Sequence, residues 1–326
     1  MRHVICTLVA ALGISAAAQA QNYPHKPVRF IIPFSPGGSS EIVARTLGHK
    51  LSESLGQQFV IESKPGGGGN IAMQEVANAE PDGYTIILGH VGSLAMNPAL
   101  FANNPAMKKP PYDANKDFAP VSLVTVVPNI FVVNSNVPVK DLKEFVALAK
   151  AKPGAINYGS AGNGSAGHLA FEYLKMVTHI DIVHVPYKGT GPMLVDLIAG
   201  QTQATSAGTP PLLPHIKSGK LRVIAVGMPH RVSSLPDTPT VAEQGYPGFE
   251  TSQWYGVIAP AKTPPAIIKK LSEEIAKATK SAEVAKRFTD DGAIAVGSTP
   301  AEFAEFIRKE QARWGEVVRK AGVKAE

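Results

Sequence analysis

Three times in its first hundred residues the chain runs from a short apolar strand through a loop of small residues into a helix. The expected strands are residues 28–34, 59–62 and 84–89; the loops are 34–40, 65–69 and 90–93; the helices pass through 42–51, 71–79 and toward Leu100. Such alternation predicts an α/β fold with a largely parallel sheet. In sheets of this kind, ligands bind in the loops at the carboxyl ends of the strands.

The same alternation restarts after residues 121–133, an apolar stretch that is long for one strand and is interrupted by Pro128 and Asn129. We interpret this stretch as the crossing into a second lobe. Beyond it we expect helices at 142–150, 168–177 and 192–199 and strands at 156–158, 182–187, 203–207 and 221–227. After a strand at 254–260, two amphipathic helices, 264–279 and 300–320, are expected to return and cover the first lobe.

The predicted architecture is therefore two α/β lobes, each a mixed β-sheet flanked by helices, joined by crossing strands and separated by a cleft. Lobe 1 is expected to comprise residues 21–124 and 246–326, and lobe 2 residues 125–245.

The N-terminus has the three parts of a secretory signal: Arg2, an apolar run at 4–14, and small residues that end in Ala18-Gln19-Ala20. We expect cleavage after Ala20 and an exported protein, with an uncleaved anchor as the alternative. The single cysteine, Cys6, lies inside this signal. The mature chain would then lack disulfides, thiolate metal sites and a cysteine nucleophile, which fits a bacterial periplasm.

Charge and motifs argue against several classes of function. The formal net charge is +6, and the basic residues are scattered, so nucleic acid is a poor candidate partner and a small anion a better one. The nucleophile pattern G-x-S-x-G and the zinc pattern H-E-x-x-H are absent. We therefore expect no catalysis, no cofactor and no metal. Residues 162–167 match G-x-G-x-x-G, but no acidic residue ends the next strand, as a dinucleotide site requires.

The loops at 34–40 and 160–165 each place backbone N–H groups, with little side-chain bulk, at the start of a helix. A helix N-terminus of this kind binds anions, and each one favours a carboxylate by about 0.3–2 kcal/mol. Two facing loops with serine hydroxyls could supply the roughly 8 kcal/mol of micromolar binding. We also expect Ser39 or Ser40 to cap the first helix. The alternative is that the glycines only form tight turns. The predicted ligand contacts are Phe34, Ser35, Gly38, Ser39, His90, Ser160, Ala161, Gly162, Asn163, Gly164 and Ser165.

Motifs along the whole mature chain resemble those of the tripartite tricarboxylate transporter receptors, the Bug or TctC-like family. They include Pro33-Phe34-Ser35-Pro36-Gly37-Gly38, Pro81-Asp82-Gly83-Tyr84-Thr85, Tyr158-Gly159-Ser160-Ala161-Gly162, Val185-Pro186-Tyr187-Lys188-Gly189 and Leu235-Pro236-Asp237-Thr238-Pro239-Thr240. The resemblance implies a two-lobed periplasmic binding protein of the type II-like, Venus flytrap kind, and we expect it to be a monomer. It further implies that the two loops hold a carboxylate and that the receptor delivers its ligand to the permease subunits of the membrane transporter.

Residues 203–209 depart from this family, because many relatives carry an acidic residue here and this chain has none. A buried ammonium group without an anionic partner is costly. We therefore expect a dicarboxylate or aromatic carboxylate rather than an amino acid, contacted by Thr205, Ser206 and Ala207, with Thr209 as a further hydroxyl. Two alternatives stay open. One is a receptor that signals to a sensor. The other is an exported α/β hydrolase, which would need a base near Ser160 or Ser165, and the sequence offers only His168 nearby.

Overall fold

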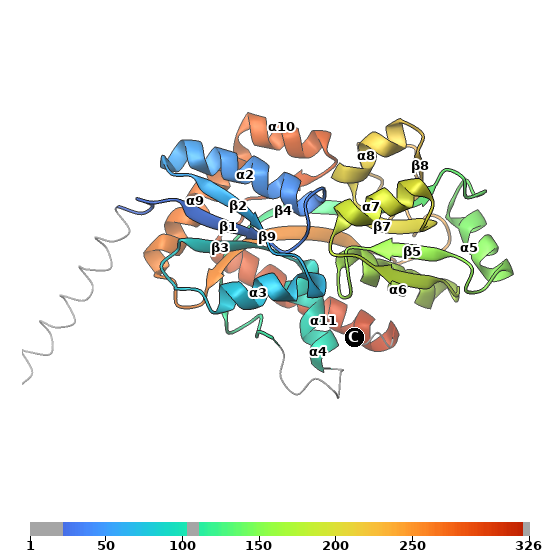
Figure 1. The fold of residues 1–326 in the computed structure, drawn as a ribbon, viewed down its shortest axis with the longest axis horizontal. Coiled ribbons are helices and arrows are strands. Elements are labelled where there is room, and N and C mark those ends of the chain that lie inside the picture. The colour runs from blue at the N-terminus through green and yellow to red at the C-terminus, as the bar shows by residue number, and fades with distance from the viewer. Residues whose placement is uncertain (1–21, 103–110, 322–326) are drawn as a thin grey trace, which may run out of the picture.

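The computed structural model describes residues 22–102 and 111–321, so the predicted signal segment and its cleavage site lie outside the described residues. The chain forms two lobes that lie side by side along the long axis of the molecule (Figure 1). Among the described helices, none combines the length and the apolar character needed to cross a bilayer.

In lobe 1, three parallel strands and the antiparallel strand β9 lead into the long strand β4, in the order β2-β1-β3-β9-β4. These strands are β1 (Val28–Ile32), β2 (Phe59–Ser63), β3 (Thr85–His90), β4 (Phe118–Asn134) and β9 (Ser252–Pro260). The two-residue strand β10 (Ile294–Ala295) adds to β4. Side chains alternate between the two faces of this sheet: Phe30 and Ile32 enter one core and Ile31 the other.

Helices cover both faces of the lobe 1 sheet. The first face packs against α2 (Ser39–Leu55), α9 (Pro265–Lys280) and α10 (Ala282–Asp290). The second packs against α3 (Asn70–Ala77), the π-helical turn η2 (Gly92–Met96), α4 (Asn97–Ala102) and α11 (Pro300–Ala321); the 3₁₀ turn η1 (Gly67–Gly69) precedes α3. The two C-terminal amphipathic helices thus return to lobe 1, as the sequence predicts.

Lobe 2 repeats the three-layer arrangement. Its sheet contains β5 (Asn157–Ser160), β6 (Val183–Pro186), β7 (Ala204–Gly208), β8 (Leu221–Val226) and the end of β4. One face packs against α5 (Leu142–Ala151) and α6 (Ala166–Thr178), and the other against α7 (Thr190–Ala199) and α8 (Thr209–Lys217). The two-lobed α/β fold is therefore confirmed.

Strand β4 belongs to both sheets. Its residues as far as Pro128 pair with β9 of lobe 1, and from Asn129 onward they pair with β7 of lobe 2. Proline has no N–H group to donate to a neighbouring strand, so Pro128 stands where the strand leaves one ladder and enters the next. The expected interruption at 128–129 is therefore a change of partner within one strand of 17 residues. The exact lobe bounds stay a prediction.

Local structure departs from the sequence-based expectations at three helices. Helix α2 is capped by Gly38 without any side-chain bond, so the expected cap by Ser39 or Ser40 is wrong, because both serines already belong to the helix. Helix α8 was not expected, since three of its nine residues are proline. The short helix α10 was also missed; it begins with a cap by Ser281, whose hydroxyl accepts from the Val284 N–H group.

Candidate ligand site between the lobes

A small cavity lies between the lobes at the carboxyl ends of β1, β3, β5 and β7. Its volume is about 20 Å³, which is room for about one water molecule. It is lined by residues of both lobes, two of them on strand β9 of lobe 1: Phe34, Ser39, Ser40, His90, Ala161, Ser165, Ala166, Gly167, Thr190, Met193, Ser206, Ala207, Gln253 and Tyr255. The loops at 34–40 and 160–165 therefore reach one cavity from opposite lobes.

Backbone packs directly on backbone around this cavity and brings the lobes into contact. The Ser35 N–H group of lobe 1 donates to the carbonyl oxygen of Lys188 in lobe 2 at 3.0 Å. At a second contact, a Cβ atom on Gly68 would lie 1.9 Å from the carbonyl oxygen of Asn163. Only glycine fits at such a distance, so these small residues permit the lobes to meet.

Two helix N-termini point into the cavity. Ser39 and Ser40 are the first residues of α2, and Ala166 and Gly167 are the first residues of α6. Helix geometry leaves the N–H groups of these positions without a partner inside the helix. With their helix dipoles, the four N–H groups form an anion site made of main chain.

Two serines that line this cavity, Ser40 and Ser206, each have a buried hydroxyl oxygen without a hydrogen-bond partner. Buried polar atoms are seldom left unpaired in folded proteins, so their convergence on one cavity marks a site for a polar ligand. The lining contains no Lys, Arg, Asp or Glu within the described part of the chain. The site therefore offers neutral groups to a ligand.

His90 is a neutral donor at this site. Its Nδ1 atom accepts from the Gly92 N–H group at 3.0 Å, which places the ring proton on Nε2. Burial lowers the pKa of His90 to about 3, against the smaller opposing effect of a hydrogen bond between the ring and the Gly68 backbone. The Phe34 ring packs against the imidazole with ring centres 4.8 Å apart. His90 thus keeps its tautomer and its orientation.

Half of the predicted contacts line the cavity, and the other half lie outside its lining. The predicted residues in the lining are Phe34, Ser39, His90, Ala161, Ser165, Ser206 and Ala207. Those outside it are Ser35, Gly38, Ser160, Gly162, Asn163, Gly164 and Thr205. The Thr205 hydroxyl donates to the Gly159 carbonyl at 2.7 Å, and the Thr209 hydroxyl donates to that of Asp291 at 3.0 Å. Both hydroxyls are therefore engaged within the protein.

Sequence reasoning missed Gln253 and Tyr255, which reach the cavity from β9. The Tyr255 hydroxyl donates to Gln253 Oε1 at 2.5 Å, and Gln253 Nε2 donates to Asn129 Oδ1 at 2.9 Å. Trp254, between them, points to the opposite face, where its indole N–H donates to Glu310 at 2.9 Å. Strand alternation was the available signal, but only the fold shows which face meets the cavity. Ser40, Ala166, Gly167, Thr190 and Met193 complete the unpredicted lining.

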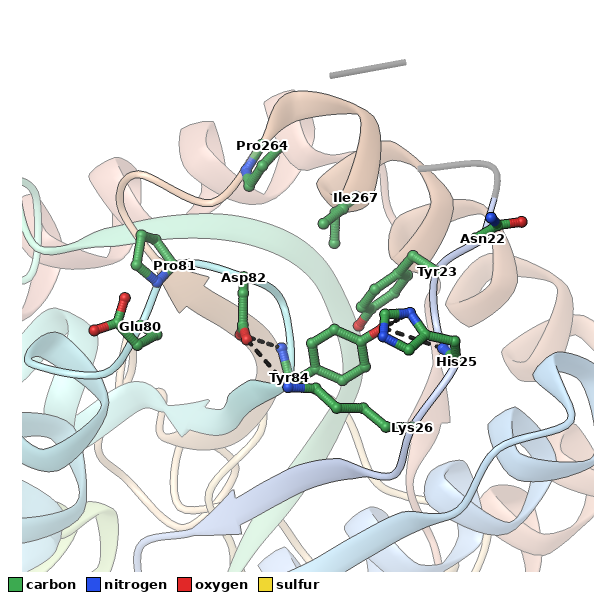
Figure 2. Close-up of a pocket in the computed structure, with 10 residues that line it drawn as sticks. All are labelled: Asn22, Tyr23, His25, Lys26, Glu80, Pro81, Asp82, Tyr84, Pro264 and Ile267. Atoms are coloured by element: carbon green, nitrogen blue, oxygen red, sulfur yellow. Dashed lines mark hydrogen bonds and ion pairs between the residues drawn. The ribbon is translucent and has the colours of Figure 1, made fainter. Parts of the chain in front are cut away.

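A larger hollow of about 890 Å³ lies at the opposite edge of lobe 1, beside the N-terminal ends of β1 and β3 (Figure 2). Its polar groups pair with one another. Tyr84 Oη is 2.8 Å from His25 Nδ1, and Lys26 lies 3.6 Å from Asp82 and over the Tyr84 ring. Among the described residues that line this hollow, none carries an unpartnered buried atom. The smaller cavity between the lobes is therefore the better candidate.

The structure also places a base beside Ser160, which the hydrolase alternative requires. His184 Nε2, on β6, is 2.7 Å from Ser160 Oγ. Ser160 is fully buried outside the cavity lining, and its hydroxyl accepts from the Gly162 N–H group at 3.0 Å. The Ser160 oxygen therefore faces neither solvent nor the cavity in this structure. Within the described residues, no group of three or more His, Cys, Asp or Glu side chains is arranged to hold a metal ion.

Residues 43–323 match the family model described as the tripartite tricarboxylate transporter family receptor. The chain belongs to this family. Protein BugT of Bordetella pertussis is 38% identical over 98% of this chain and 97% of its own length. The family is one of solute receptors rather than enzymes.

Solved structures of receptors in this group share the fold. The periplasmic binding protein BugD superposes with a TM-score of 0.88 at 33% identity and covers 93% of this chain and all of its own. Rpa4515 of R. palustris, solved with adipate, gives 0.89 at 35% over 93% of this chain and 99% of its own. MatC of Rhodopseudomonas palustris, with bound malate, gives 0.85 at 34% over 91% of this chain and all of its own. This receptor therefore has the two-lobed fold of a periplasmic binding protein.

Proposed function

We propose that this receptor captures a small carboxylate between its lobes and delivers it to the permease subunits of a tripartite tricarboxylate transporter. The observation that carries this proposal is the convergence of two helix N-termini on one uncharged cavity. One helix end contributes only about 0.3–2 kcal/mol toward a carboxylate. Hydrogen bonds to a charged group add about 1.5–3 kcal/mol each, so the Ser40 hydroxyl and the backbone N–H groups bring micromolar binding within reach.

A dicarboxylate is the ligand that this lining favours. Rpa4515 and MatC were solved with adipate and malate, which are both dicarboxylates. Beyond the helix N-termini, the cavity holds further neutral polar groups on Ser206 and Gln253 for a second carboxylate. An amino acid would bring an ammonium group, and no described lining residue carries a negative charge to pair with it. A short aromatic carboxylate also lacks an ammonium group, and its ring would pack against Phe34 and Met193.

Binding then includes a movement of the lobes. The cavity has room for about one water molecule, so a ligand of several carbon atoms enters only when the lobes separate. Strand β4 belongs to both lobes and is the natural hinge, together with the return of the chain from lobe 2 into β9. We place the mature receptor in the periplasm as a monomer, with its signal peptide cleaved after Ala20 and its lobes divided as predicted from the sequence.

The test is a thermal-shift screen followed by calorimetry on the purified receptor. The panel contains malate, succinate, adipate, benzoate, aspartate and glutamate. At least one of the first four should raise the melting temperature and bind with a micromolar Kd, since a ligand that binds only the folded state stabilises it. Binding of aspartate or glutamate alone would overturn the ligand class, and no binding across the panel would overturn carboxylate capture.

A serine variant ties the binding to this cavity. Ser40→Ala removes a donor at the start of α2 and should raise the Kd about tenfold, or about 1.4 kcal/mol. Ser54→Ala is the matched control on the same helix, because the Ser54 hydroxyl donates to the Leu51 carbonyl at 3.3 Å, outside the cavity lining. Equal affinities of the two variants would place the carboxylate elsewhere.

Uptake by vesicles that contain the permease subunits, measured with and without the receptor, tests delivery of the ligand.

A further inference from the structure

Two histidines stand behind the lobe 2 loop that reaches the cavity. His168, in the first turn of α6, accepts from the Gly164 N–H group through Nδ1 at 3.1 Å. His184, on β6, lies 2.7 Å from Ser160 Oγ, and that oxygen accepts from the Gly162 N–H group at 3.0 Å. Both glycine N–H groups of the loop are therefore bound on the side of the histidines.

The two imidazoles stack on each other. Their ring centres are 4.1 Å apart and their planes differ by 13°. Tyr158 stacks on the other side of His184 at 4.9 Å, and Phe171 stacks on Tyr158 at 4.5 Å. The four rings form a column, which we call the aromatic column, and it joins the loop to β5, β6 and α6. Rings packed in this way have one orientation, so the acceptor atoms have fixed positions.

The acceptor role requires a neutral His168 ring, because protonation of Nδ1 would remove the acceptor for Gly164. Burial lowers the pKa of His168 to about 4, with a smaller effect of Lys175. Burial also lowers the pKa of His184 to about 3, assisted by His168 and Lys175 and opposed by Glu172. Glu172 and Lys175 form an ion pair at 2.8 Å on α6. Both histidines are thus neutral at pH 7.

We propose that His168 and His184 are positioning residues for ligand capture. Gly162 and Gly164 have positive φ angles of 122° and 75°. Glycine is free to adopt many other backbone conformations, so these residues alone do not fix the shape of the loop. The bonds behind the loop select one of these conformations. In it, Ala161 and Ser165 line the cavity, and Ala166 and Gly167 begin the helix with their N–H groups toward the ligand.

This inference rests on the proposed function for its effect on affinity, but it also predicts a property of the ligand-free protein. Amide hydrogen exchange at Gly164 reports the bond to His168 directly. His168→Leu should speed this exchange at least tenfold, because Leu offers no acceptor. His168→Asn should restore most of the protection, because its Oδ1 atom takes the place of Nδ1. For the second histidine, the readout is exchange at Gly162, whose N–H group is bound by the Ser160 oxygen that His184 contacts. His184→Leu should speed this exchange, and His184→Gln should restore the protection.

The affinity measurement uses the acid from the panel that binds the wild type best. His168→Leu should raise its Kd at least tenfold, with His168→Asn within threefold of the wild type. Equal exchange rates in wild type and His168→Leu would overturn the proposal, as would an Asn variant that behaves like Leu while its melting temperature matches the wild type. If the exchange pattern holds and no acid of the panel binds, carboxylate capture fails and the anchoring of the loop stands.

Discussion

Gly191→Ala should block the contact between the lobes without harming either lobe. Gly191 is the second residue of α7 in lobe 2, and a Cβ atom built there would lie 2.0 Å from the carbonyl oxygen of Pro36 in lobe 1. Ordinary contact begins near 3.4 Å, so the lobes must move apart by about 1.4 Å at this point. The backbone of Gly191 is helical and accepts alanine, and alanine in a helix is favoured over glycine by about 1 kcal/mol.

The expected loss of affinity follows from the contacts that the separation removes. The bond from the Ser35 N–H group to the Lys188 carbonyl, 3.0 Å long, lies beside Gly191 and contributes about 1 kcal/mol. One bond from a helix N-terminus to the ligand carboxylate contributes about 1.5–3 kcal/mol and weakens when the lobes stay apart. Complete loss of the first bond and partial weakening of the second remove about 1.4–2.7 kcal/mol, which predicts a Kd about 10- to 100-fold above that of the wild type.

Calorimetry with the best acid of the panel measures this change, and small-angle X-ray scattering with saturating ligand measures the closure. Gly315→Ala is the matched control, because Gly315 also lies in a helix, α11, and its nearest neighbour would be the end of the Arg319 side chain at 3.5 Å. Both variants should melt at or above the wild-type temperature. An affinity of Gly191→Ala within twofold of the wild type would refute the view that lobe contact at Pro36 is part of binding.

Two further predictions concern stability. The buried histidines His90, His168 and His184 titrate near pH 3–4 in the folded protein and near 6.5 when unfolded, so the unfolded chain binds more protons between these values. The free energy of unfolding should therefore fall on acidification from about pH 6.5 to 4, by up to about 1.4 kcal/mol per pH unit for each histidine. Urea titrations at pH 7, 6 and 5 test this, and a stability independent of pH would contradict it. Glu310→Leu should cost about 2–4 kcal/mol, because it leaves the buried N–H groups of Trp254 and Trp314 without their acceptor; Glu316→Leu, on the exposed face of the same helix, is the control in thermal melts.

The loops at 34–40 and 160–165 were predictable because their signal is local: a strand, small residues and a helix are contiguous in the sequence. The sequence could not show whether the Thr205 or the Ser206 side chain meets the cavity. They alternate on β7, and which of them meets the cavity depends on where the sheet lies relative to the other lobe. Tyr255 was missed for a related reason: the sequence predicts the strand β9 but does not show which of its faces meets the cavity. The sequence predicts an interruption at Pro128 because proline is unusual inside a sheet. The structure shows its cause, which is the change of partner from β9 to β7 at this point of β4.

Strand β4 has a consequence for how the receptor unfolds. Its two halves contribute side chains to all four hydrophobic cores, such as Val124, Leu123, Phe131 and Ile130. Melting of either lobe would strip part of this strand of its neighbours and weaken the packing of the other lobe. The two lobes therefore form one cooperative unit, and we expect a single calorimetric transition with equal van't Hoff and calorimetric enthalpies. A ligand that touches both lobes would then shift the whole transition at once.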